Sequence, residues 1–169
     1  SFGLQPWKIK VVSDQAIKDQ LLPHAFDQPQ ITSCSHLLVL CGLHDISDQF
    51  IESFVQQSLD AGSDPEKLSA YRTMLLNNIH HMKEHGTLTS YISNQAYIML
   101  GTIVTVCAMM GIDTAPMGGF NSRQFDTILG LDKQGVHATV LCALGYRSTN
   151  DKRSHHSKFR FPLDDVILR

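Results

Sequence analysis

The chain has 169 residues, of which 43% are hydrophobic and 18% are charged, and its formal net charge is −2. This length and composition predict one globular domain over residues 1–169 and exclude a disordered chain. The near-neutral charge gives no reason to expect nucleic acid as a partner, and the four cysteines, which have no C-x-x-C spacing, indicate a reducing compartment such as the cytoplasm.

The first half of the chain alternates between strand and helix patterns. Strands are expected over residues 7–12 and 36–42, and helices over 14–22, 47–59 and 64–85. Residues 36–42 form a continuous apolar run, which is typical of a central strand that is covered on both faces. Asp64-Pro65-Glu66 is a strong helix start, because it combines a capping side chain, a proline at the first position and an acid.

The second half is dominated by one long apolar helix, expected from about Ser90 to Met110 and ended by Gly111. From Ile98 onward this helix is apolar on every side, so we expect it to be buried all round. Its fully apolar part is too short to span a membrane. Pro116 and the glycines at 118 and 119 then predict a turn with accessible backbone amides.

The remaining chain predicts a short helix over 121–130, a buried strand over 138–145 and a final strand over 166–168. Between the last two lies a basic tail, residues 152–160. A few apolar strands surrounded by helices predict an α+β sandwich.

The only local motif match for chemistry is His81-x-x-Glu84-His85, the zinc-peptidase pattern, which gives a zinc hydrolase as one alternative. The histidines also suit the helix end where they stand, because cations are favoured there, and no third ligand is evident. Dinucleotide, P-loop and hydrolase motifs are absent, and no nucleophile stands beside a base. An enzyme of this composition would need a cofactor to carry its chemistry.

Two segments could contact a ligand. In the tail, Lys158 and Arg160 alternate with Phe159 and Phe161, so an extended chain would place both charges on one side, where they could bind a phosphate. The alternative is a solvated basic strand with its rings packed inward. The double glycine is either a plain tight turn or a place where the backbone approaches a ligand.

Three segments together resemble the FMN-dependent nitroreductase family. Ser1-Phe2-Gly3-Leu4-Gln5-Pro6-Trp7 resembles the S-S-x-x-x-Q-P-W segment of the family, and residues 94–120 resemble its long helix and P-x-x-G-F turn. Lys158-Phe159-Arg160 resembles its C-terminal K-x-R. The order and spacing of the three segments also fit, and the resemblance covers essentially the whole chain. The family domain begins with a further helix carrying phosphate-binding residues, so we expect the N-terminal part of that domain to be missing here.

The resemblance implies a nitroreductase-like sandwich with a mostly antiparallel sheet, and a homodimer in which the C-terminal strand is exchanged. FMN would lie at the subunit interface. The implied cofactor-binding residues are Ser1 and Gly3 from the partner subunit, Asp27 and Gln30 on the ribityl or pyrimidine side, Pro116, Met117, Gly118 and Gly119 at the ring, and Lys158 and Arg160 at the phosphate. Many members carry an acid where Gly118 stands and an asparagine where Gly3 stands, so contacts from these positions would be made by the backbone alone.

The implied chemistry is ping-pong: NAD(P)H gives hydride to the flavin N5 and leaves, and a nitroaromatic, quinone or related small acceptor enters the same pocket. No residue of the chain is expected to be catalytic itself, and neither metal nor membrane is expected. Two alternatives share the fold: a flavin or enone reductase, and a flavin-binding remnant without turnover.

Overall fold

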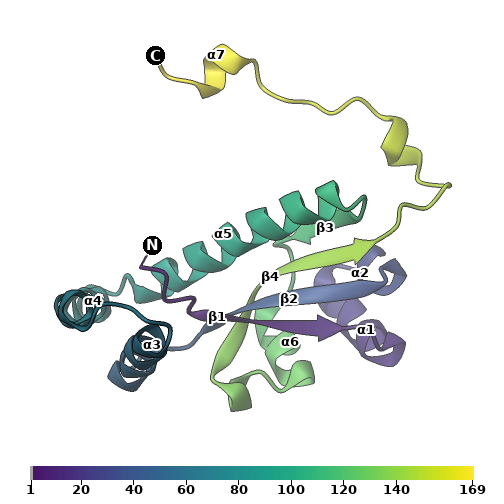
Figure 1. Cartoon of the computed structure of the whole chain (residues 1–169). Coiled ribbons are helices and arrows are strands. Elements are labelled where there is room, and N and C mark those ends of the chain that lie inside the picture. The colour runs from purple at the N-terminus through teal and green to yellow at the C-terminus, as the bar shows by residue number, and fades with distance from the viewer. Residues whose placement is uncertain (1) are drawn as a thin grey trace.

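The computed structural model describes residues 2–169, without the side chains of Lys152 and Arg153, and its centre is a four-stranded antiparallel sheet (Figure 1). The strands are β1 (Trp7–Val12), β2 (His36–Leu43), β3 (Asp113–Met117) and β4 (Val136–Gly145), in the spatial order β1-β2-β4-β3. The two most apolar strands, β2 and β4, take the middle, where both faces are covered. This arrangement confirms the α+β class and the antiparallel sheet.

Helices cover both faces of the sheet (Figure 1). One face carries α1 (Gln15–Leu21), the 3₁₀ turn η1 (Leu22–Ala25), α2 (Gln30–Ser33) and α6 (Ser122–Leu129), and the other carries α5 (Leu88–Met109); α3 (Asp48–Asp60) and α4 (Pro65–Glu84) pack together at one end. Side chains of a strand alternate between faces. Accordingly, Leu37 and Val39 of β2 pack towards Phe125 of α6, whereas Leu38 and Leu40 pack towards α5.

Most helix starts lie where the capping residues predict them. The side chain of Asp64 accepts hydrogen bonds from the amides of Glu66 and Lys67, and Asn121 accepts one from the amide of Gln124. Gly130 ends α6 in the left-handed conformation. These local signals need no tertiary contact, which explains why the sequence predicts them well.

The expectation that α5 is buried on all sides is wrong for the single chain. Residues of its outer face are strongly exposed, among them Ile98 at 59% and Met109 at 83%. The helix packs on one face of the sheet, and no described residue covers its other side. Its 22 residues are also long and apolar enough to cross a membrane, a criterion that core helices of soluble proteins meet as well.

Two further expectations fail. Pro116 and Met117, expected as part of the turn, belong instead to the edge strand β3, which was not predicted. Pro116 is tolerated there because an edge strand has one unpaired side. The expected strand over 166–168 does not form: Val166 ends one helical turn, α7 (Leu163–Val166), and residues 167 and 168 belong to no helix or strand. The turn α7 belongs to a tail that leaves β4, contains the short turn η3 (Lys152–His155) and runs away from the body of the molecule (Figure 1).

Candidate functional site

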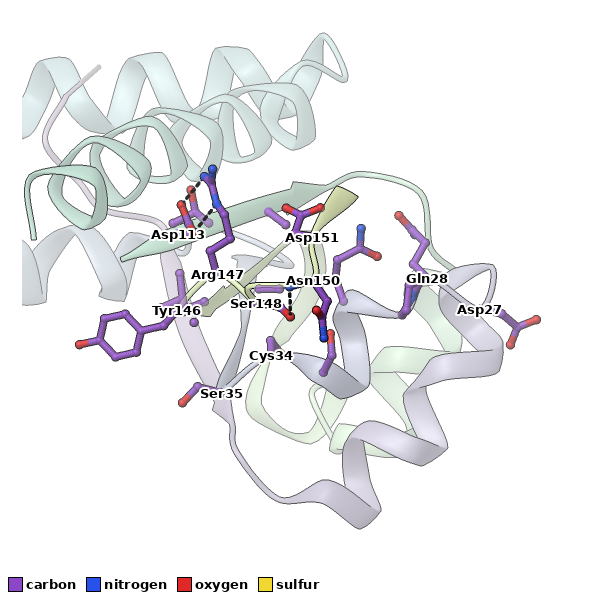
Figure 2. A pocket seen from close by; sticks show the side chains of 18 of the residues that line it. Asp27, Gln28, Cys34, Ser35, Asp113, Tyr146, Arg147, Ser148, Asn150 and Asp151 are labelled. Carbon is purple, nitrogen blue, oxygen red and sulfur yellow. Dashed lines mark hydrogen bonds and ion pairs between the residues drawn. The ribbon is translucent and has the colours of Figure 1, made fainter. Parts of the chain in front are cut away.

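A cavity of about 1040 Å³ lies between α2, the loop that precedes it, and the adjacent ends of β3 and β4 (Figure 2). The loop contributes Asp27 and Gln28, and α2 contributes Gln30. Asp113 comes from the start of β3, and Arg147 from the segment that follows β4. The lining combines these polar and charged side chains with apolar ones such as Phe26 and Leu144.

Asp113 and Arg147 form a two-pronged ion pair at one side of the cavity, with N–O distances of 2.8 and 2.7 Å (Figure 2). Hydrogen bonding from Arg147 lowers the pKa of the Asp113 carboxyl, and the charge of Lys158 adds a weaker effect in the same direction.

The loop over residues 24–30 is tied to the turn that follows β3. Gln28 Nε2 donates to the carbonyl oxygens of Ala25 and Gly119, both at 2.9 Å. The amide of Asn121 donates to His24 O at 2.8 Å. The backbone of the loop is constrained, because the consecutive residues Phe26 and Asp27 adopt left-handed φ values of 53° and 51°. The two segments thus form one rigid edge of the site.

Gly118 and Gly119 are glycines that the fold itself does not require. Neither has a positive φ. A Cβ on Gly118 would meet Tyr97 Oη at 3.6 Å, and a Cβ on Gly119 would meet the Phe26 ring at 3.4 Å, which are tolerable contacts. Both residues are exposed, and neither amide donates a hydrogen bond to any described residue. The turn therefore offers two free amides from residues that carry no side chain of their own.

Gln30 offers a hydrogen-bond acceptor, whereas the glycine turn offers donors. Its Oε1 is buried and finds no hydrogen-bond donor in the described part of the chain. A buried acceptor without a donor is costly, so this atom suits a ligand that brings an N–H group. By contrast, the Asp27 side chain points outward at the rim (Figure 2).

The ten cofactor-binding positions implied by the resemblance fall into three groups. Asp27 and Gln30 line the cavity. Pro116, Met117, Gly118 and Gly119 lie beside it at the end of β3, and the Met117 side chain is in the core, so it can offer only its backbone. The third group lies elsewhere: Lys158 and Arg160 are on the exposed tail, and Gly3 precedes Leu4, which packs near the start of α5. Ser1 lies outside the described residues.

The cavity has no reactive side chain of its own. Burial raises the pKa of the Cys34 thiol, which disfavours the nucleophilic thiolate. All four cysteines are free, as their spacing predicts. His81 and His85 of the zinc-peptidase pattern stack on each other with ring centroids 4.0 Å apart, and within the described residues no three His, Cys, Asp or Glu side chains form a metal site. The structure gives zinc chemistry no support.

Sequence reasoning missed several residues that shape this site. Lys18 is almost fully buried and donates to Cys34 O at 2.7 Å, which fixes the end of α2 under the cavity. Gln28, Phe26 and Arg147 contribute only through tertiary contacts. The residues around them in the sequence predict only a polar loop and the end of a strand, and nothing in that pattern indicates a role in a site.

Comparison with known proteins gives consistent matches over most or nearly all of the chain. The sequence profile of the nitroreductase family matches residues 1–146. A Staphylococcus aureus protein named "Putative NAD(P)H nitroreductase" is 30% identical over 181 aligned residues, which cover 99% of this chain and 77% of that protein. A Haemophilus influenzae protein of the same name is 27% identical.

Solved structures agree with the fold. A nitroreductase-type structure from Bacillus subtilis has a TM-score of 0.85 at 21% identity and covers 99% of this chain and 79% of its own. A second, from Exiguobacterium sibiricum and solved in complex with FMN, has a TM-score of 0.81 at 22% identity, covering 100% and 79%. These structures share the overall fold of this chain, and the match of the family profile to residues 1–146 shows that the chain belongs to the nitroreductase family.

Proposed function

We propose that the chain is an FMN-dependent oxidoreductase that takes electrons from NAD(P)H and reduces nitroaromatics, quinones or similar small acceptors, the two substrates using one site in turn. The observation that carries this proposal is the pair of free, exposed amides at Gly118 and Gly119. Membership of the nitroreductase family and the names of the relatives support it.

The polar groups of the site suit the flavin ring. Ring carbonyl oxygens and unprotonated ring nitrogens accept hydrogen bonds, and the two glycine amides are donors without a partner in the chain. The ring also has an N–H group, and Gln30 Oε1 is a buried acceptor without a donor. Bound FMN would supply the hydride chemistry that the chain's own side chains lack.

We further propose that the functional unit is a homodimer of a cytoplasmic protein. The accessible surface is 10997 Å², whereas a folded monomer of this mass is expected to expose about 8,300 Å². Large apolar side chains are exposed on α5, such as Ile98 and Met109, and on the tail, where Phe159 and Phe161 are exposed. A second subunit would cover these groups and could bring its Gly3 segment and its tail to the flavin.

Two measurements on the purified chain test the proposal. FMN should bind with a dissociation constant in or below the micromolar range, and NADH or NADPH should then be oxidised when a nitroaromatic or quinone is added. Binding without turnover on any acceptor would indicate a flavin-binding remnant. Turnover on free flavin or an enone alone would assign a different flavin reaction, and a protein that binds no FMN would contradict the proposal.

A double variant tests the glycine turn itself. Gly118→Ala with Gly119→Ala adds two methyl groups where the chain has room for them, so the thermal unfolding midpoint should stay unchanged. FMN should bind at least about tenfold more weakly, because the methyl groups separate the ligand from the amides and about 1.4 kcal/mol corresponds to a factor of ten. Unchanged affinity in a folded double variant would remove the turn from the flavin site.

A further inference from the structure

The side chain of Tyr97, on α5, lies close to the glycine turn that follows β3. Its Oη lies 3.6 Å from the position that a Cβ on Gly118 would occupy. Apart from the chain neighbours of Gly118, no other described atom lies within 4 Å of that position. The space that a side chain at residue 118 would fill is therefore bordered by a phenol hydroxyl from another element.

The Tyr97 hydroxyl is available for a ligand. The side chain is 50% exposed, and its hydroxyl makes no hydrogen bond with any described residue. A hydroxyl can donate one hydrogen bond and accept others. Within the part of the chain that the structure describes, Tyr97 Oη is the side-chain polar group nearest to the Gly118 position.

Tyr91 provides an internal comparison. It stands six residues earlier on α5, and its hydroxyl also lacks a partner among the described residues. That hydroxyl is buried, and the ring packs against Phe2 with centroids 5.8 Å apart, away from the glycine turn. Both tyrosines belong to one helix, but only Tyr97 lies beside Gly118.

We propose that the Tyr97 hydroxyl is a side-chain hydrogen-bond donor to the ligand held at the Gly118–Gly119 turn, and that it tunes the electron affinity of a flavin bound there. This inference rests on the proposed function. A flavin ring becomes more electron-rich when it is reduced, and hydrogen bonds to charged acceptors are stronger than those to neutral ones. An uncharged phenol donor would therefore stabilise reduced FMN more than oxidised FMN.

The experiment compares Tyr97→Phe with Tyr91→Phe in the full chain. Each change removes one hydroxyl and keeps the aromatic ring that packs in the protein, so neither should prevent folding. We expect Tyr97→Phe to weaken the binding of reduced FMN about tenfold more than that of oxidised FMN, which lowers the two-electron potential of the bound flavin by about 30 mV. Tyr91→Phe should change neither quantity.

The outcomes separate the two proposals. Wild-type protein that binds no FMN overturns the proposed function, and this inference falls with it. Wild-type protein that binds FMN, together with equal potentials in wild type and Tyr97→Phe, overturns the inference alone. Equal shifts in both tyrosine variants would also overturn it, because the effect would then be general to α5.

Discussion

Among single residues, a histidine pair away from the cavity gives the chain a pH-dependent feature. His137 of β4 stacks against His44 with ring centroids 5.4 Å apart, and His44 Nε2 lies 3.2 Å from Asp132 Oδ1. Burial, followed by the charge of His44, lowers the pKa of His137, while Asp126 and Asp132 act in the opposite direction. Folding therefore favours the neutral form of His137 over its charged form.

This lowered pKa predicts that acid destabilises the fold. Below about pH 6.5 the unfolded chain binds a proton at this histidine before the folded chain does, so the free energy of unfolding falls as the pH decreases. His137→Gln removes this contribution. Chemical denaturation between pH 7 and pH 5 should show a shallower loss of stability in the variant, and an equal or steeper loss would contradict the assignment.

The sequence predicted part of the site at the residue scale. The double glycine could be singled out because two adjacent glycines indicate by themselves a turn with accessible backbone. Gln28 and Tyr97 could not, because their roles depend on which loop lies beside Gly118 and Gly119 in space. The left-handed conformation of Phe26 was equally unpredictable, since an aromatic residue rarely adopts it.

At the scale of secondary structure, α5 carries an apolar stripe that its own chain leaves uncovered. Ile98, Val106 and Met109 recur at helical spacing on its outer side and are all exposed. The opposite side, with Met99, packs on the sheet. A helix that is apolar all round but packs on one side only is expected to have a second contact, which the second subunit of the proposed dimer would supply.

Substituting the stripe should separate the subunits. Met109→Glu would place an unpaired carboxylate in the contact, and we expect the dimer dissociation constant to rise by about 100-fold or more. Light scattering over a concentration series measures the change. Met74→Glu on α4, which alters another exposed methionine by the same substitution, is the control. A dimer that is equally stable in both variants would contradict a contact through α5.

Elements were predictable where their signals are local. The helix starts at Asp64 and Asn121 and the apolar strands β2 and β4 follow directly from the sequence. The short strand β3 was missed, because a proline-containing segment becomes a strand only through its pairing with β4. The exposure of α5 was missed because hydrophobicity alone does not show which chain covers a helix.

At the scale of the whole molecule, the tail is the part least explained by one chain. Residues 155–169 are all exposed, and the three core clusters contain no residue beyond Leu144. The Phe159 and Phe161 rings contact each other, with centroids 5.3 Å apart, and so lie on the same side of the tail. The rings are not packed inward as the alternative reading of this segment required. Exchange of the tail in a dimer remains a prediction.

The tail should matter for the ligand more than for the fold. Lys158→Ala with Arg160→Ala should weaken FMN binding by about 100-fold or more, because two charge-assisted hydrogen bonds to a phosphate would be lost. The unfolding midpoint should not change. Lys8→Ala with Lys10→Ala on β1 removes the same charge at the same spacing and serves as the control. Equal affinity in the two double variants would refute the phosphate assignment.

The order of strands in the sheet also determines how much chain entropy is lost when the sheet forms. The central strands β2 and β4 are far apart in the sequence: roughly 90 residues separate Leu43 from its partner Val136. Pairing the two strands closes these residues into a loop. Closing such a loop costs about 4 kcal/mol of chain entropy, a large part of the 5–15 kcal/mol net stability of typical domains. The longest apolar strands of the chain form this pair, so apolar burial offsets the ordering cost where that cost is greatest.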